Sequence, residues 1–178
     1  CVSETADKIR ERVIEAARAY QSADMGRALE VYLAILDEVH DYPPVLHGLG
    51  TVYFRLRRYG DAAHVFERFL AHVPDELAFT RALGHCYYRL GQYDKASDHY
   101  EAVLRLDPKI VEALRGYALS RMRVGDTDTA LAKMREVVAL DAEHWEAHAW
   151  IAQMEFDEEN LEAALAACER ARDLALYE

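Results

Sequence analysis

Apolar residues recur along the chain with the spacing of amphipathic helices. Segments of about 13 residues carry them at positions i, i+3, i+4 and i+7, and a short polar turn joins each segment to the next. Residues 90–93 (LGQY) and 124–127 (VGDT) are two such turns. Gly91 and Gly125 suit the left-handed backbone that ends a helix. The pattern therefore predicts an all-α protein built from antiparallel helix pairs.

The helix pairs repeat with a period of 34 residues, and residues 87–108 echo residues 53–74. Frames begin at residues 43, 77, 111 and 145, and a degenerate frame fits at 9–42. A small residue occupies the middle of each first helix: Ala16, Gly50, Gly84, Ala118 and Ala152. An alanine opens each second helix: Ala28, Ala62, Ala96, Ala130 and Ala164. Four residues later comes a bulky or soft residue: Tyr32, Phe66, Tyr100, Met134 and Cys168. A fixed period of this size predicts a solenoid.

The frames at 43–76 and 77–110 resemble the tetratricopeptide repeat family. The second of them matches the family motif with Leu83, Gly84, Tyr87, Gly91, Tyr93, Ala96, Tyr100 and Pro108. The frames at 111–144 and 145–178 are weaker, because Arg121 and Glu155 stand where the first-helix tyrosine belongs. The resemblance implies a right-handed superhelix over residues 9–178, preceded by a polar tether at residues 1–8. It also implies that the first helices line a concave groove.

Arginine recurs at two groove positions of the frame. Position 13 is Arg55, Arg89 and Arg123 in the three middle frames, and position 5 is His47, Arg81 and Arg115. The guanidinium group binds carboxylates through two hydrogen bonds and stacks on aromatic rings. A second interpretation stays open, because a basic residue near a helix C-terminus also stabilises the helix dipole.

An apolar and aromatic line accompanies the arginines at position 12 of the frame. Its members are Tyr20, Phe54, Tyr88, Met122 and Phe156. These residues either meet a ligand or pack against the adjoining repeat. The chain is thus predicted to be a non-enzymatic scaffold or adaptor that binds an extended partner segment with acidic and apolar residues. The predicted groove contacts are His47, Phe54, Arg55, Arg81, Tyr88, Arg89, Arg115, Met122 and Arg123.

Two kinds of partner are disfavoured. Family members that clamp the carboxylate tail of heat-shock chaperones use Lys, Asn and Arg, but His47, Thr51, Ala82, Glu112 and Gly116 stand in those places here. Nucleic acid is disfavoured because the net charge is −11. The last frame, 145–178, holds nine acids and two bases. Its final segment is apolar on more than one side, which suggests self-association through the C-terminal helix or another cover.

Cys1 opens the chain and leaves two expectations open. It is either a fragment boundary or the lipidated first residue of a bacterial lipoprotein that helps to assemble an outer-membrane pilus or secretion pore. In the second case a lipid on Cys1 would be the only membrane contact and the protein would be periplasmic; otherwise it would be cytoplasmic. The odd count of three cysteines, with no short spacing, predicts neither a disulfide framework nor a zinc motif.

The strongest candidate for metal chemistry is a pair of histidines. His144 and His148 lie four residues apart, with Asp141 nearby, but no third ligand is obvious. We find no spacing typical of a nucleophile and its base, and no glycine-rich nucleotide loop, since Gly50 in "HGLG" is expected to be a packing position. No cofactor and no enzymatic activity are therefore predicted.

Overall fold

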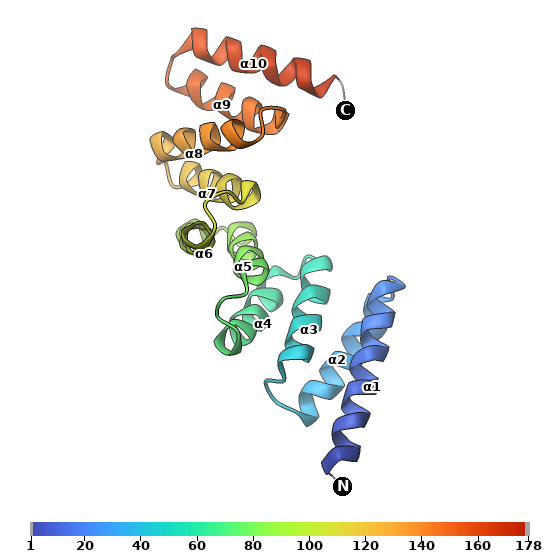
Figure 1. The fold of residues 1–178 in the computed structure, drawn as a ribbon. Coiled ribbons are helices and arrows are strands. Elements are labelled where there is room, and N and C mark those ends of the chain that lie inside the picture. The colour runs from blue at the N-terminus through green and yellow to red at the C-terminus, as the bar shows by residue number, and fades with distance from the viewer. Residues whose placement is uncertain (1, 177–178) are drawn as a thin grey trace. The chain divides into compact units, whose positions relative to one another are not determined.

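The chain folds into helices throughout the part that the structure describes. The computed structural model describes the backbone of residues 2–176 and the side chains of residues 6–176. This part contains ten helices and no strand (Figure 1). They are α1 (Val2–Gln21), α2 (Met25–Glu38), α3 (Pro43–Arg55), α4 (Tyr59–His72), α5 (Leu77–Arg89), α6 (Tyr93–Leu106), α7 (Val111–Arg123), α8 (Thr127–Leu140), α9 (Trp145–Asp157) and α10 (Leu161–Ala175). The all-α solenoid prediction is confirmed, and α3, α5, α7 and α9 begin at the predicted frame starts.

The N-terminus differs from the prediction. Residues 2–8, expected to form a tether, belong to α1, which begins at Val2. The reason is local: the sequence has no glycine before Gly26 and no proline before Pro43, so nothing in it stops a helix from extending toward the N-terminus.

The turns inside the helix pairs share one left-handed residue. Gly91 and Gly125 have φ values of 76° and 88°, as their predicted role requires. Ala23, Arg57 and Glu159 occupy the same frame position in the other pairs and have φ values of 62°, 58° and 62°. A side chain there costs energy that glycine avoids. The turn geometry is thus kept even where the sequence does not favour it.

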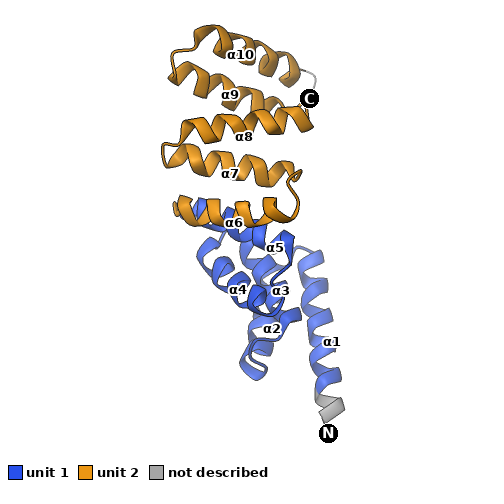
Figure 2. Cartoon of the chain, turned by 60° about the vertical axis from the view of Figure 1, so that its left-hand side comes forward, with its two compact units in different colours: residues 1–90 blue, residues 91–178 orange. Residues whose placement is uncertain are grey.

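The helices form two compact units. Unit 1 comprises residues 1–90 and unit 2 comprises residues 91–178 (Figure 2). The boundary falls at Gly91, in the turn inside the 77–110 frame rather than between two frames. Unit 1 therefore holds α1 to α5, and unit 2 holds α6 to α10.

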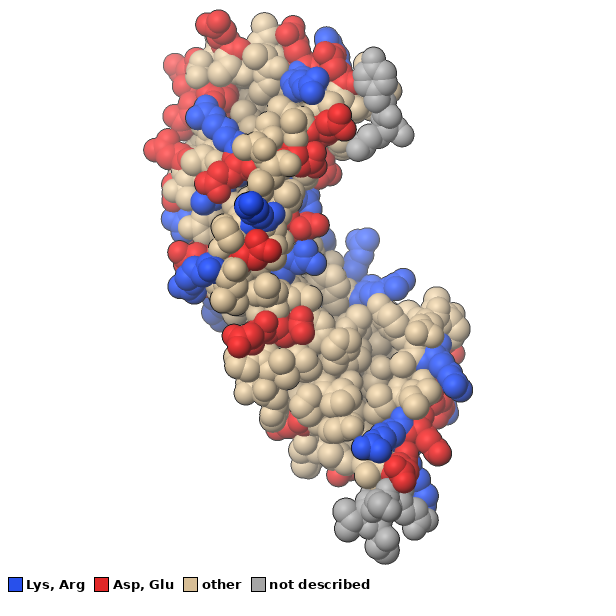
Figure 3. Space-filling view, viewed as in Figure 1, with Lys and Arg blue, Asp and Glu red and all other residues tan. Residues whose placement is uncertain are grey.

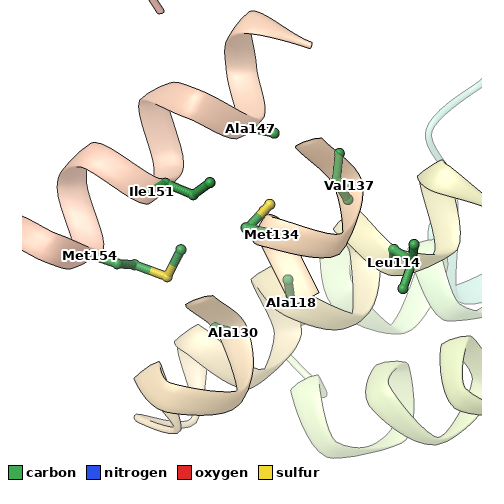
Figure 4. Packing of buried hydrophobic residues seen from close by; sticks show 8 residues of the cluster. All are labelled: Leu114, Ala118, Ala130, Met134, Val137, Ala147, Ile151 and Met154. Atoms are coloured by element: carbon green, nitrogen blue, oxygen red, sulfur yellow. The ribbon is translucent and has the colours of Figure 1, made fainter. Parts of the chain in front are cut away.

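The core of unit 2 shows how successive repeats pack. Side chains of α9 meet those of α7 and α8 in one buried cluster (Figure 4). Its members are Leu114, Ala118, Ala130, Met134, Val137, Ala147, Ile151 and Met154. Ala118 and Ala130, predicted as close-approach positions, are fully buried. Each first helix thus fits into the groove of the helix pair before it.

Glycine provides the closest approaches within each unit. A Cβ atom on Gly50 would lie 2.5 Å from Cε1 of Phe66, so the packing role predicted for this glycine is confirmed. A Cβ atom on Gly48 would lie 2.2 Å from Cζ of Tyr32. In unit 2 the same relation holds between Gly116 and Tyr100, at 2.3 Å. A tyrosine ring of one repeat therefore fills the space that a glycine of the next repeat leaves open.

Candidate functional site

Two arginines of unit 1 lie over tyrosine rings. The Arg55 Cζ atom is 5.2 Å from the centroid of the Tyr20 ring, and the Arg89 Cζ atom is 5.0 Å from that of Tyr59. Both distances are typical of cation–π contacts. Arg55 and Arg89 end α3 and α5 and are exposed, and within the described part of the chain neither forms an ion pair with a carboxylate. Their guanidinium groups are therefore held on one face, with hydrogen-bond donors directed along the ring plane.

The third arginine repeats this arrangement in unit 2. The Arg123 Cζ atom is 5.9 Å from the centroid of Tyr93. Arg123 follows Tyr93 by 30 residues, as Arg89 follows Tyr59. Each arginine therefore covers a tyrosine that opens the second helix of the preceding frame. We call Arg55, Arg89 and Arg123 the arginine row.

The other predicted arginine line is engaged differently. In unit 2, Nη1 of Arg115 donates to Oε2 of Glu146 at 3.0 Å, and both side chains are partly exposed. In unit 1, the His47 ring lies 4.7 Å from that of Phe79 and 6.0 Å from that of Phe69. Arg81 is half-buried. The three residues at position 5 therefore do not share one environment.

The apolar line at position 12 packs mainly between repeats. Phe54 has ring contacts with Tyr59, Phe66 and His85, at centroid distances of 5.9, 6.3 and 5.3 Å. Met122 packs against the core cluster of unit 2. Tyr88 is half-buried in unit 1. Contact between repeats, one of the two expected roles, thus accounts for Phe54 and Met122.

The sequence analysis missed an aromatic cluster in unit 1. Phe79 contacts Phe66 and Phe69, each at 4.8 Å between centroids, and His85 contacts Tyr59 at 5.7 Å. Together with His47 and Phe54, these rings link α3, α4 and α5. Phe66 and Tyr59 were recognised only as repeat positions. The missed signal was their spacing of 13 and 26 residues from Phe79 and His85.

The two candidate metal ligands contact the backbone instead. His144 is the N-cap of α9, and its Nδ1 atom accepts a hydrogen bond from Ala147 N at 3.2 Å. Nε2 of His148 lies 3.1 Å from the carbonyl oxygen of Ala142. Among the described residues, no group of three potential ligands is close enough to hold a metal ion. The two imidazoles are thus placed for helix capping rather than for shared coordination.

The described cysteines have contrasting environments. Cys86 is fully buried, and burial raises the pKa of its thiol to about 12. Cys168 is exposed on α10. The expectation for Cys1 lies outside the described residues. Within those residues, none of the helices is both long enough and apolar enough to cross a membrane.

The geometry defines a class of protein: a solenoid of helix pairs that presents its first helices on one face of each unit. Comparison with protein-family models matches the tetratricopeptide repeat at residues 47–110, 81–123 and 118–176. These segments cover well over half of the sequence. The chain belongs to the tetratricopeptide repeat family.

Solved structures agree on the fold. MamA from Desulfovibrio magneticus RS-1 is 20% identical, with a TM-score of 0.90 and 97% of both chains covered. YrrB, described as a TPR protein with an unusual peptide-binding site, is 23% identical, with a TM-score of 0.82 over 92% of this chain and 84% of its own. A further MamA structure, MSR-1, is 18% identical, with a TM-score of 0.84, 96% of this chain and 98% of its own. No curated protein sequence matches the chain.

Proposed function

We propose that the protein is a non-enzymatic scaffold that binds an extended segment of a partner protein along its first helices. The segment carries carboxylates, which meet the arginine row, and apolar side chains, which meet the exposed parts of the neighbouring aromatic residues. The similarity to YrrB, a repeat protein with a peptide-binding site, is consistent with this function.

The state of Arg55 and Arg89 is the observation that carries the proposal. Most other described arginines lie beside a carboxylate; for example, Arg68 pairs with Asp41 at 2.6 Å and Arg121 with Asp126 at 2.7 Å. Arg55 and Arg89 instead stack on tyrosine. Stacking uses the face of the guanidinium group and leaves its N–H edge for a planar anion. A bound carboxylate would therefore not have to displace an existing ion pair.

The stacking also serves stability, because each arginine joins two frames. A cation–π contact at an exposed site is worth about 0.5–1 kcal/mol, and a positive charge in the last helical turn adds a similar amount. These contributions fix the side chains before a ligand arrives. A preorganised side chain loses less entropy on binding than a mobile one.

The test is partner capture followed by direct binding. Proteins retained from the native source by the wild type are identified, and acidic peptides tiled from them are titrated against the wild type and the Arg55→Glu/Arg89→Glu variant. Arg105→Glu/Arg170→Glu is the matched control, since it changes the charge equally on exposed arginines of the second helices. We expect loss of binding in the first variant and retention in the control. An unchanged helical melt would exclude unfolding as the cause.

Salt dependence gives an independent check. Exposed charge pairs are screened over about 10 Å at 0.1 M salt, so affinity should fall steeply between roughly 50 and 500 mM salt. If affinity stays constant over this range, or if both double variants bind equally well, the arginine row has only a structural role.

A further inference from the structure

The last helix pair of unit 2 leaves an apolar recess open. Its volume is about 550 Å³, and α9 and α10 line it with Ala152, Phe156, Ala164, Leu165, Cys168 and Ala171. Phe156 and Leu165 are each 61% exposed, although they are large and apolar. We call this surface the C-terminal recess. It lies in unit 2 and is separate from the surface discussed above for Arg55 and Arg89.

The C-terminal recess is the repeat equivalent of a groove that is already filled. Ala118, Ala130, Met134 and Val137 line the groove between α7 and α8, and Ala152, Ala164, Cys168 and Ala171 follow them by 34 residues. The earlier groove receives Ala147, Ile151 and Met154 of α9 (Figure 4). These are positions 3, 7 and 10 of the frame. The recess therefore has the shape of a site for a helix with apolar residues at the same three positions.

A second relation specifies the size of one ligand side chain. Position 24 of each frame faces position 6 of the next first helix. Tyr32 and Tyr100 face Gly48 and Gly116, so the larger residue is matched by the smallest one. The smaller Met134 lies in the cluster against which Trp150 packs. In the recess, position 24 is Cys168, which is smaller still, so the geometry favours a bulky apolar residue at position 6 of the ligand.

A third relation specifies a polar contact. Position 11 of a first helix meets position 25 of the preceding frame. In unit 1 the Tyr87 hydroxyl donates to Glu67, and in unit 2 Arg135 donates to Glu155. In the recess, position 25 is Glu169, which is exposed. A tyrosine, lysine or arginine at position 11 of the ligand would complete the pair.

Charge around the recess supports a basic ligand. Acidic side chains outnumber basic ones over α9 and α10 (Figure 3). Glu158, Glu159 and Glu162 are exposed beside the turn that joins the two helices. Complementary charge speeds association and selects partners.

The first helix of a second copy does not fit these requirements. In α1, positions 3, 7 and 10 are Glu11, Glu15 and Arg18, which are exposed. Glu15 accepts hydrogen bonds from Arg27 within unit 1. Docking α1 in the recess would bury these charged groups against alanine and leucine, which is unfavourable. Head-to-tail assembly is therefore not the use of the recess.

We propose that the C-terminal recess binds an amphipathic helix of a partner protein in the place that a next first helix would take. The helix carries apolar residues at positions 3, 7 and 10, a bulky apolar residue at position 6 and a tyrosine, lysine or arginine at position 11. This is binding of a helix in a groove, with the apolar face buried and the charged flanks at the rim.

The probe is a labelled synthetic helix of this pattern, with leucine at its third, seventh and tenth positions, tryptophan at its sixth and arginine at its eleventh. Fluorescence anisotropy with the whole chain should give saturable binding in the micromolar range. Cys168→Trp should weaken binding by about tenfold through overpacking, and a probe with glycine at its sixth position should restore it. Glu169→Arg should weaken binding by about threefold, and glutamate at the eleventh position of the probe should restore it.

The restored pairs keep the test informative if a variant folds poorly, because an unfolded protein would bind neither probe. Failure of the wild type to bind, or equal affinity of all variants, would overturn the proposal. A dimer in light scattering that Leu165→Asp dissolves would assign the recess to a second copy and also overturn it. The same holds if a longer natural chain exists and does not bind the probe, since its own next segment would then occupy the recess.

Discussion

Gly116 in α7 is the position where one methyl group gives the sharpest test of how the repeats fit together. A Cβ atom there would lie 2.3 Å from Cζ of Tyr100 and 2.5 Å from its Cε1, whereas ordinary contacts lie at 3.4–4 Å. Tyr100 is only 4% exposed, so its ring has no open space to enter. Gly116→Ala should gain about 1 kcal/mol of helix propensity and lose about 1–3 kcal/mol through overpacking. We expect a net loss of about 1 kcal/mol.

Gly60 is the matched control. It lies in α4, and a Cβ atom there would meet nothing within 4 Å. Gly60→Ala should therefore be neutral or stabilise the protein by up to about 1 kcal/mol. The two glycine-to-alanine changes are chemically identical, so the difference in their effects isolates the packing contribution.

The assay is urea unfolding followed by far-ultraviolet circular dichroism and tryptophan fluorescence. Trp145 and Trp150 are the two tryptophans of the chain, and both belong to unit 2, so fluorescence reports on the unit that contains Gly116. Tyr100→Met should remove the conflict, because a flexible side chain occupies that frame position at Met134. A double-mutant cycle should then give a coupling energy of about 1–2 kcal/mol. If Gly116→Ala stabilises the protein as Gly60→Ala does, or if the coupling is zero, the proposed fit between repeats is wrong.

Three further predictions concern other sites. Cys168 should react with a thiol reagent in the native protein, whereas Cys86, buried and with its thiol pKa raised to about 12, should react only after unfolding; fast labelling of Cys86 would contradict its placement. Burial and then the hydrogen bond to Glu67 raise the pKa of Tyr87 from 10.0 to about 12, so the folded state keeps this proton longer than the unfolded state does. Stability should therefore fall as the pH rises from 10 to 12, and Tyr87→Phe should lose less over that range, as urea midpoints at stepped pH would show. Arg57→Gly should stabilise the protein by about 1 kcal/mol, because Arg57 has a φ of 58°; a lower melting temperature would refute this assignment.

The helices and turns could be predicted because their signals are local. Apolar spacing fixed the four first-helix starts from residue 43 onward, and Gly91 and Gly125 fixed two turns. The failure at residues 2–8 has the same origin. A polar segment without glycine or proline is compatible with either a tether or a helix, and only its continuity with α1 decides.

The partners of the candidate site could not be predicted in the same way. Arg55 and Arg115 have the same side chain on equivalent helices, yet the first stacks on Tyr20 and the second pairs with Glu146. These contacts join residues that are 35 and 31 positions apart. Composition cannot choose between them. The constant 30-residue offset between an arginine and its tyrosine was present in the sequence, but its meaning depends on knowing which helices are adjacent.

The contact between positions 11 and 25 shows why the last frames remain helical pairs despite losing the motif tyrosine. Tyr87 donates its hydroxyl hydrogen to Glu67, whereas Glu155, only 3% exposed, accepts hydrogen bonds from Arg135 and Asn160. The donor and acceptor have exchanged sides, but the buried polar group is satisfied in both cases. An unpaired carboxylate at that depth would be costly. The frame therefore requires a matched pair rather than a tyrosine, and a partner helix that met Glu169 would obey the same requirement.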